Sequence, residues 1–108
     1  MPRQPKHAIT FAPEVLDHLG GIERKHHGAL QQAIDEQLTY TPAEETRNRK
    51  PLEQPAPFDA TWELRCGPQN RFRVLYNVDS EVGTVSILAI GVKEGDRLLI
   101  GGEECHRS

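Results

Sequence analysis

Two arginines, Arg65 and Arg73, fall on neighbouring predicted strands and have the chemistry to hold an anion together. Segment 62–78 reads as two strands joined by a four-residue turn, Gly67 to Asn70. Apolar residues alternate along both strands, at Trp62, Leu64, Cys66, Phe72, Val74, Tyr76 and Val78. Because strand side chains point to alternate faces, these residues share one buried face and the arginines share the other. A planar guanidinium binds phosphate through paired N–H donors, so this pattern predicts an anion site.

Cleavage of a nucleic-acid phosphodiester needs an acid, a base and positive charge on the phosphoryl oxygens. We expect Arg65 and Arg73 to supply that charge together with Lys93, which follows the central strand and can reach the same face. Other basic side chains expected to contact RNA are Arg47, Arg49, Lys50, Arg71 and Arg97. The alternative is structural: the two strand arginines pair with acids such as Glu63 or Asp79.

The charge of the chain is unevenly distributed. The 108 residues carry a net charge of −3, but segment 47–76 holds six basic against three acidic side chains, a balance of +3. A local basic zone on an acidic protein fits a phosphate-rich partner, and a solvated charged loop remains the alternative.

No metal or cofactor motif is present in the sequence. His26 and His27 are consecutive on a predicted helix, and neither His–x3–His nor Cys–x2–Cys occurs. Walker, Rossmann and nucleophile-elbow signatures are also missing. We therefore expect no metal and no cofactor, and we expect Cys66 and Cys105 to be free thiols of a cytoplasmic protein.

The expected fold is an α+β domain with two helices packed on one face of a small, mainly antiparallel sheet. Its order is strand, helix, helix and three strands, in one domain spanning 1–108 with loose tails at 1–5 and 105–108. Four prolines make segment 41–60 the longest irregular stretch. No apolar run approaches the roughly 20 residues of a membrane helix. The predicted elements are Lys6 to Phe11, Pro13 to Gly20, Ile22 to Thr39, the hairpin, Thr84 to Val92, and an edge strand within 96–104.

Three segments in this order resemble the RelE/ParE superfamily of bacterial type II toxin–antitoxin toxins. They are the loop 47–52 (RNRKPL), the hairpin with WELR and FRVLY, and the ending AIGVK followed by IGGEE. The resemblance runs from about Lys6 to Glu104. It implies a toxin neutralised by a cognate antitoxin. RelE-like members cut messenger RNA on the ribosome without a metal, whereas ParE-like members inhibit DNA gyrase.

One departure from the RelE pattern keeps the function open. RNA-cutting members often use a Tyr or His near the end of the sheet as acid or base, and segment 95–100 (GDRLLI) has neither. The proton-transfer role then falls to Lys93, Glu103 or a loop residue. We expect an mRNA endoribonuclease. The alternatives are a non-catalytic gyrase inhibitor and a degenerate member that only binds an antitoxin.

Overall fold

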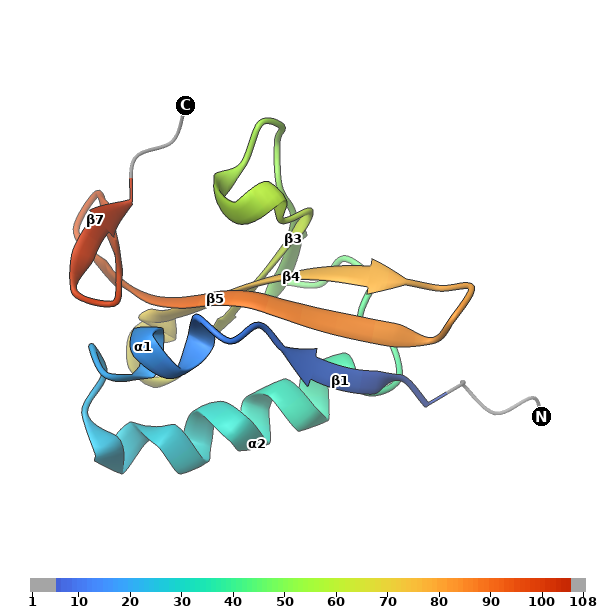
Figure 1. The fold of residues 1–108 in the computed structure, drawn as a ribbon, viewed down its shortest axis with the longest axis horizontal. Coiled ribbons are helices and arrows are strands. Elements are labelled where there is room, and N and C mark those ends of the chain that lie inside the picture. Colours follow the sequence, from blue (N-terminus) through green and yellow to red (C-terminus); the bar gives the residue numbers. More distant parts are fainter. Residues whose placement is uncertain (1–5, 106–108) are drawn as a thin grey trace.

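The computed structural model describes residues 6–105, which form one sheet with two α-helices on one side (Figure 1). Within these residues the sheet has seven strands, in the order β2-β3-β4-β5-β6-β7 with β1 beside β5. All neighbouring strands are antiparallel except β1 and β5. The predicted α+β class, with both helices on one face, is confirmed. The strands are β1 (Ala8–Phe11), β2 (Arg49–Pro51), β3 (Trp62–Cys66), β4 (Phe72–Asp79), β5 (Thr84–Glu94), β6 (Arg97–Ile100) and β7 (Glu103–Cys105).

The helices are α1 (Val15–Leu19) and α2 (His27–Leu38), and three short 3-10 segments accompany them: η1 (Arg24–His26), η2 (Pro57–Asp59) and η3 (Pro68–Asn70). Leu30, Ile34 and Leu38 recur every fourth residue of α2, so they form one stripe that is buried against the sheet. From the sheet, Val74 and Tyr76 pack in the same core, as the alternation along the hairpin predicts. Arg65 and Arg73 are consequently directed to the side opposite the helices, which we call the outer face.

Strand β5 is the centre of the sheet and is apolar on both faces. It pairs with β4 along its length, with β1 over Thr84 to Ile87 and with β6 over 91–94. A register shift places Leu75 opposite Ala89 but Tyr76 opposite Ile87, so Leu88 is an extra residue in the ladder. The shift lets Ile87 join the helix-side core while Leu88 packs on the outer face.

Several elements differ from the sequence-based expectation. Segment 41–60 is not irregular throughout, because β2 pairs with β3 and η2 follows it. Pro51 is compatible with β2 because β2 is an edge strand, where a missing N–H costs no ladder bond. The C-terminal edge strand is a hairpin, β6–β7, and Cys105 ends β7 rather than lying in a loose tail. Residues 1–5 and 106–108, the remainder of the expected tails, lie outside the described residues.

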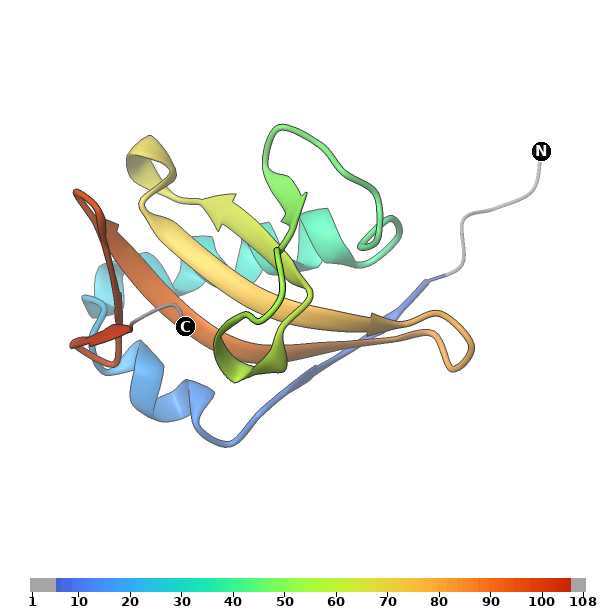
Figure 2. The same ribbon diagram turned by 90° about the horizontal axis from the view of Figure 1, so that it is seen from above.

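The outer face is less open than its sequence suggests. A second apolar cluster forms there from Ala60, Leu75, Ala89 and Ile100. Figures 1 and 2 show the η2 segment and the β6–β7 hairpin on this side of the sheet, away from α2. They leave the arginine-bearing part of β3 and β4 between them.

Across residues 6–105, none of the helices has the length and apolar character needed to cross a membrane.

Candidate functional site

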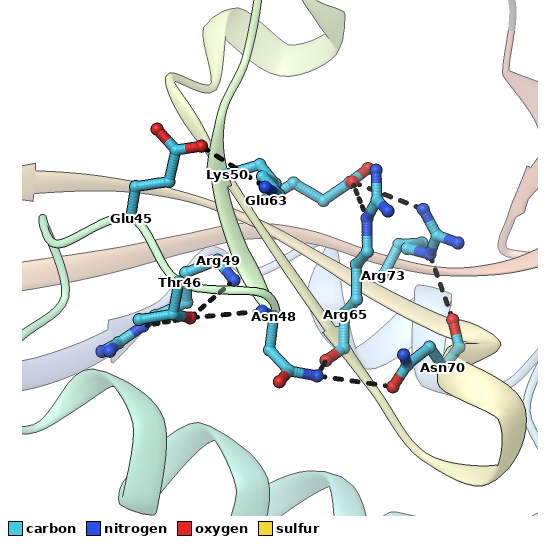
Figure 3. Close-up of polar contacts among 9 residues, drawn as sticks. All are labelled: Glu45, Thr46, Asn48, Arg49, Lys50, Glu63, Arg65, Asn70 and Arg73. Carbon is cyan, nitrogen blue, oxygen red and sulfur yellow. Dashed lines mark hydrogen bonds and ion pairs between the residues drawn. The ribbon is translucent and has the colours of Figure 1, made fainter.

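Arg65 and Arg73 lie opposite each other in the β3–β4 register and share one carboxylate (Figure 3). Nε of Arg65 donates to Oε1 of Glu63 at 3.1 Å, and Nη1 of Arg73 donates to the same oxygen at 3.4 Å. The Glu63 side chain is 3% exposed, against 40% for Arg65 and 14% for Arg73. A buried carboxylate needs such partners, so Glu63 fixes both guanidinium groups. The three side chains retain one net positive charge.

The structural alternative for these arginines was an ion pair with an acid such as Glu63. Both arginines form that ion pair in the structure. Asp79, the other acid considered, is engaged elsewhere: its Oδ1 accepts from the backbone N–H groups of Glu81 and Val82. An arginine carries five N–H donors, and Arg65 directs only Nε at Glu63. Pairing therefore orients the Arg65 side chain without occupying it fully.

Two asparagines support the arginine-bearing strands. Asn48 Nδ2 donates to the carbonyl oxygen of Arg65 at 3.1 Å and to Oδ1 of Asn70 at 3.4 Å. The carbonyl oxygen of Asn70 accepts from Nε of Arg73 at 3.2 Å. Asn70 has φ 54°, a left-handed conformation that asparagine tolerates better than most residues. These contacts join β2, β3 and the η3 turn, and their only sequence signal was the presence of Asn at turn positions.

Lys93 reaches the outer face as expected and lines a cleft together with Glu63 and Arg73. This cleft, which we call the arginine cleft, has a volume of about 250 Å³. Its far wall comes from the β5–β6 turn and the C-terminal hairpin, at Asp96, Leu98, Glu104 and Cys105. Arg73 and Lys93 thus line a concave site beside Arg65, together with the acids Glu63, Asp96 and Glu104.

Arg49 does not have the position expected of an RNA-binding side chain. It is 6% exposed, and Nη1 donates to the carbonyl oxygens of Gln37 and Thr41 and, at 2.9 Å, to Oγ1 of Thr41. The reason is the register of β2: Arg49 pairs with Leu64, a helix-side residue, so its side chain turns inward. The Gln37 carbonyl belongs to the last turn of α2, where carbonyl groups lack helical partners. Arg49 is therefore a structural link between α2 and β2.

The other predicted basic residues are dispersed. Lys50 pairs in register with Glu63 and its Nζ lies 3.3 Å from Oε2 of Glu45. Arg47 and Arg97 are exposed. Arg97 pairs with Glu94, one position out of phase with the outer-face pair of Lys93 and Leu98. Arg71 is exposed but lines a different cavity, of about 200 Å³, with His26 at the end of the sheet. The structure thus unites Arg65, Arg73 and Lys93 and leaves Arg71 apart.

Cys66 and Tyr76, which lie in the sheet, are unsuited to chemistry: Cys66 is a poor nucleophile and Tyr76 is a poor proton donor. Burial raises the pKa of the Cys66 thiol to about 11, opposed by the charge of Arg73. Burial also raises the pKa of the Tyr76 hydroxyl, opposed by Arg49, and that hydroxyl donates to the carbonyl oxygen of Pro42 at 2.7 Å. Both side chains are neutral near pH 7, and both belong to the helix-side core.

No family model matches this sequence, and no curated protein matches it. Among solved structures, the chain is similar to one from the crystal structure of the toxin–antitoxin complex RelBE2 of Mycobacterium tuberculosis. The TM-score is 0.67 over 86% of this chain and 98% of that chain, with 22% sequence identity. The fold is that of a RelE-type toxin. In this RelE-type fold the arginine cleft lies on the outer face, and its lining comes from β3, β4, β5, the turn after β5 and the β6–β7 hairpin.

Proposed function

We propose that this chain is the toxin of a type II toxin–antitoxin system and that it cleaves ribosome-bound messenger RNA. One observation carries the proposal: Arg65, Arg73 and Lys93 meet around the buried Glu63 on the outer face of a RelE-type fold. A cation cluster in a concave, partly desolvated site stabilises charge that develops on a phosphoryl group. Because these side chains supply the charge themselves, we propose cleavage without a metal.

In this proposal Arg65 and Arg73 hold the scissile phosphate and Glu63 holds them in place. Lys93, on the adjacent strand, adds positive charge at the leaving or attacking oxygen. Proton transfer falls to Lys93 or to Glu103 of the C-terminal hairpin, because Tyr76 and Cys66 are committed to the core. Preorganised donors of this kind lower a barrier because they need little reorganisation during the reaction.

The exposed cations around the cleft serve RNA binding rather than chemistry. We assign this role to Arg47, Lys50 and Arg97, with Arg71 as a contact beyond the cleft. Their interactions with phosphates are screened by salt, so they contribute affinity and orientation. Arg49 is not included, since its guanidinium is bound within the protein.

The partner in this proposal is a cognate antitoxin, encoded beside the toxin and covering exposed apolar and basic surface. The similar solved chain comes from a toxin–antitoxin complex, which supports a partner of this class. Phe11 and Leu16, 43% and 77% exposed, line an apolar groove of about 330 Å³ that such a segment can cover.

Induction of the protein alone in bacteria tests the proposal. We expect growth arrest and cleavage of transcripts within ribosomes, mapped by primer extension. In purified reactions the protein should cut ribosome-bound message and leave gyrase supercoiling unchanged. Intact transcripts together with inhibited supercoiling would replace this proposal by the gyrase-inhibitor function.

The gyrase alternative has one specific observation in its favour. Segment 95–100, which holds β6 and the turn before it, contains neither Tyr nor His, so the usual acid or base of RNA-cutting members has no counterpart there. A protein that only binds its target needs no such group. The paired assay above separates the two functions, because each predicts a change in a different readout.

A further inference from the structure

A second cavity lies beside the arginine cleft, with a volume of about 400 Å³. Its walls come from three separate segments, namely α1, η2 and the β6–β7 hairpin. Glu104 and Cys105 line both this cavity and the arginine cleft, so a ligand can extend from one to the other across β7. The volume falls in the range of roughly 300–1,000 Å³ that small-molecule sites occupy.

Phe58 forms an aromatic wall of this cavity. Its side chain is 46% exposed, and its ring meets the ring of His18 edge-on at 5.6 Å. The Phe58 backbone is left-handed, with φ 60°, which a bulky residue seldom adopts. Two hydrogen bonds hold the segment: Asn77 Nδ2 donates to the Asp59 carbonyl at 3.2 Å, and Gln54 Nε2 to the Ala60 carbonyl at 3.0 Å. The exposed ring is therefore held in place by its loop.

The polar side of the cavity combines a neutral donor with acidic acceptors. Nδ1 of His18 accepts from the Ile90 N–H at 3.4 Å, and burial lowers the pKa of His18, so near pH 7 the proton is on Nε2. Every buried polar side-chain atom in residues 6–105 has a hydrogen-bond partner. Nε2 of His18 has no partner among these residues, so this atom is not buried. It is accessible from a cavity that the His18 ring lines. Three acidic residues, Asp17, Glu103 and Glu104, also line the cavity.

This cavity has three acids and no Lys or Arg in its lining, so unlike the arginine cleft it does not favour a phosphate, and the acids do not form a metal site. Among the described residues, no three His, Cys, Asp or Glu side chains converge as a metal ion requires. The lining suits a flat, neutral ligand whose edge carries N–H donors beside one acceptor. Guanine has that edge, with N1–H and N2–H₂ for a carboxylate and O6 for a donor such as His18. Uracil offers one N–H between two acceptors.

We propose that this cavity binds a nucleobase, guanine in preference to the others, next to the phosphate held in the arginine cleft. Phe58 provides the stacking surface, Glu103 or Glu104 accepts from the base, and Nε2 of His18 donates to O6. The inference rests on the proposed function, because it takes RNA as the substrate. It makes the cavity a determinant of which nucleotide flanks the cleaved bond.

Nuclear magnetic resonance titration of the full chain with GMP, AMP, CMP and UMP tests base preference directly. We expect saturable shifts at Phe58 and Gly101, and GMP should bind about 5- to 150-fold more tightly than UMP, the effect of one two-bond contact to a base. Equal affinities for the four nucleotides, or no saturable binding at Phe58, would overturn the proposal.

Variants at the cavity make the test specific. Phe58→Asn, which accepts a left-handed backbone, should weaken GMP binding about 5- to 150-fold, whereas Phe58→Tyr should retain it. Glu103→Gln or Glu104→Gln should reduce the preference for GMP over UMP. Glu81→Gln, in the β4–β5 turn, removes the same charge outside the cavity and should change nothing. If Glu103→Gln and Glu104→Gln both keep the wild-type preference for GMP over UMP, the proposed contact between these glutamates and guanine is wrong.

The outcome for the cavity can be separated from the outcome for the proposed function. Cleavage of ribosome-bound message without base-selective GMP binding retains the nuclease and removes the nucleobase pocket. Base-selective binding that depends on Phe58, in a protein that leaves message intact, retains the pocket and removes the nuclease. The nucleotide titration needs no catalysis, so each result stands by itself.

Discussion

Glu63 determines how the two central arginines can act. A buried acid between two guanidinium groups limits their motion and leaves these three side chains with one net positive charge. Ion pairs of this kind add little stability when one member is exposed, as Arg65 is. Under the proposed function their effect is geometric, since a fixed fork loses less entropy when it binds a phosphate.

Replacing either arginine tests this role. We expect Arg65→Ala and Arg73→Ala each to slow cleavage of ribosome-bound message roughly 30- to 1000-fold, about 2–4 kcal/mol in the barrier. The helix-side core should stay intact, as circular dichroism and thermal unfolding can verify. Lys25→Ala is a matched control, because the ion pair of Lys25 with Glu23 is exposed. Wild-type cleavage in both arginine variants would make the pair structural.

His18 should make stability depend on pH. Burial lowers its pKa from the usual 6.5, against the opposing effects of Glu14 and Asp17. The unfolded chain therefore takes up a proton at a higher pH than the folded protein does. The stabilisation is complete above about pH 6.5 and is lost as the pH falls through the lower folded pKa.

The measurement is urea unfolding of wild type and His18→Asn between pH 7.5 and 5. The wild-type free energy of unfolding should decrease with falling pH relative to that of the variant. Asn can still accept from the Ile90 N–H, so this difference isolates the titration of the imidazole. If the free energies of unfolding of wild type and His18→Asn differ by the same amount at every pH, His18 has the same pKa in the folded and unfolded states.

At the scale of elements, short-range patterns predicted some segments and not others. The alternation of the hairpin and the four-residue repeat of α2 are local signals. The hairpin formed as predicted, whereas the predicted helix from Ile22 to Thr39 is α2 from His27 to Leu38, preceded by η1. Strands β2 and β7 have three residues each, too few for a periodic signal, and depend on partners that fold elsewhere. The cavity beside Phe58 had no signal, because its walls come from distant segments.

Arg49 illustrates the same limit at the site. The sequence places it in a basic loop run, where we expected its loss to weaken RNA binding. Pairing of β2 with β3 instead turns it toward the last turn of α2. A one-residue change in register would have reversed the orientations of Arg49 and Lys50. Local charge patterns cannot distinguish the two registers.

We now expect Arg49→Ala to act on stability. The change leaves the half-buried carbonyl groups of Gln37 and Thr41 without their charged donor, which costs about 2–4 kcal/mol. Chemical denaturation measures the loss. Arg47→Ala, two residues away and exposed, should stay within about 0.5 kcal/mol of wild type. Equal stability of the two variants would show that the Arg49 contacts are replaceable by water.

The whole molecule separates its two surfaces across the sheet. The helices occupy one face, and the arginine cleft opens on the other. The apolar groove at Phe11 and Leu16 lies at α1, apart from the cleft residues. Under the proposed function, a neutralising partner can therefore bind the helix side without contacting the arginines.

Co-expression with the product of the adjacent gene tests this view of the partner. We expect growth to recover and a stable complex to copurify, with the groove protected from hydrogen exchange. Leu16→Asp should weaken the complex, because it places a charge on the apolar groove, yet leave the isolated protein folded. No copurification and no relief of growth arrest would contradict a working toxin–antitoxin pair.

The parallel pairing of β1 with β5 determines when a nascent chain can complete its sheet. Ala8 to Phe11 lie beside Thr84 to Ile87, so the first strand has no partner until most of the chain has been synthesised. Such distant contacts form late because closing a long loop must precede them. Lys93 comes later still in the chain, so the arginine cleft cannot assemble on a ribosome that has not passed residue 93. A ribosome that stalls before residue 84 releases a fragment without the central strand, and under the proposed function that fragment is inactive.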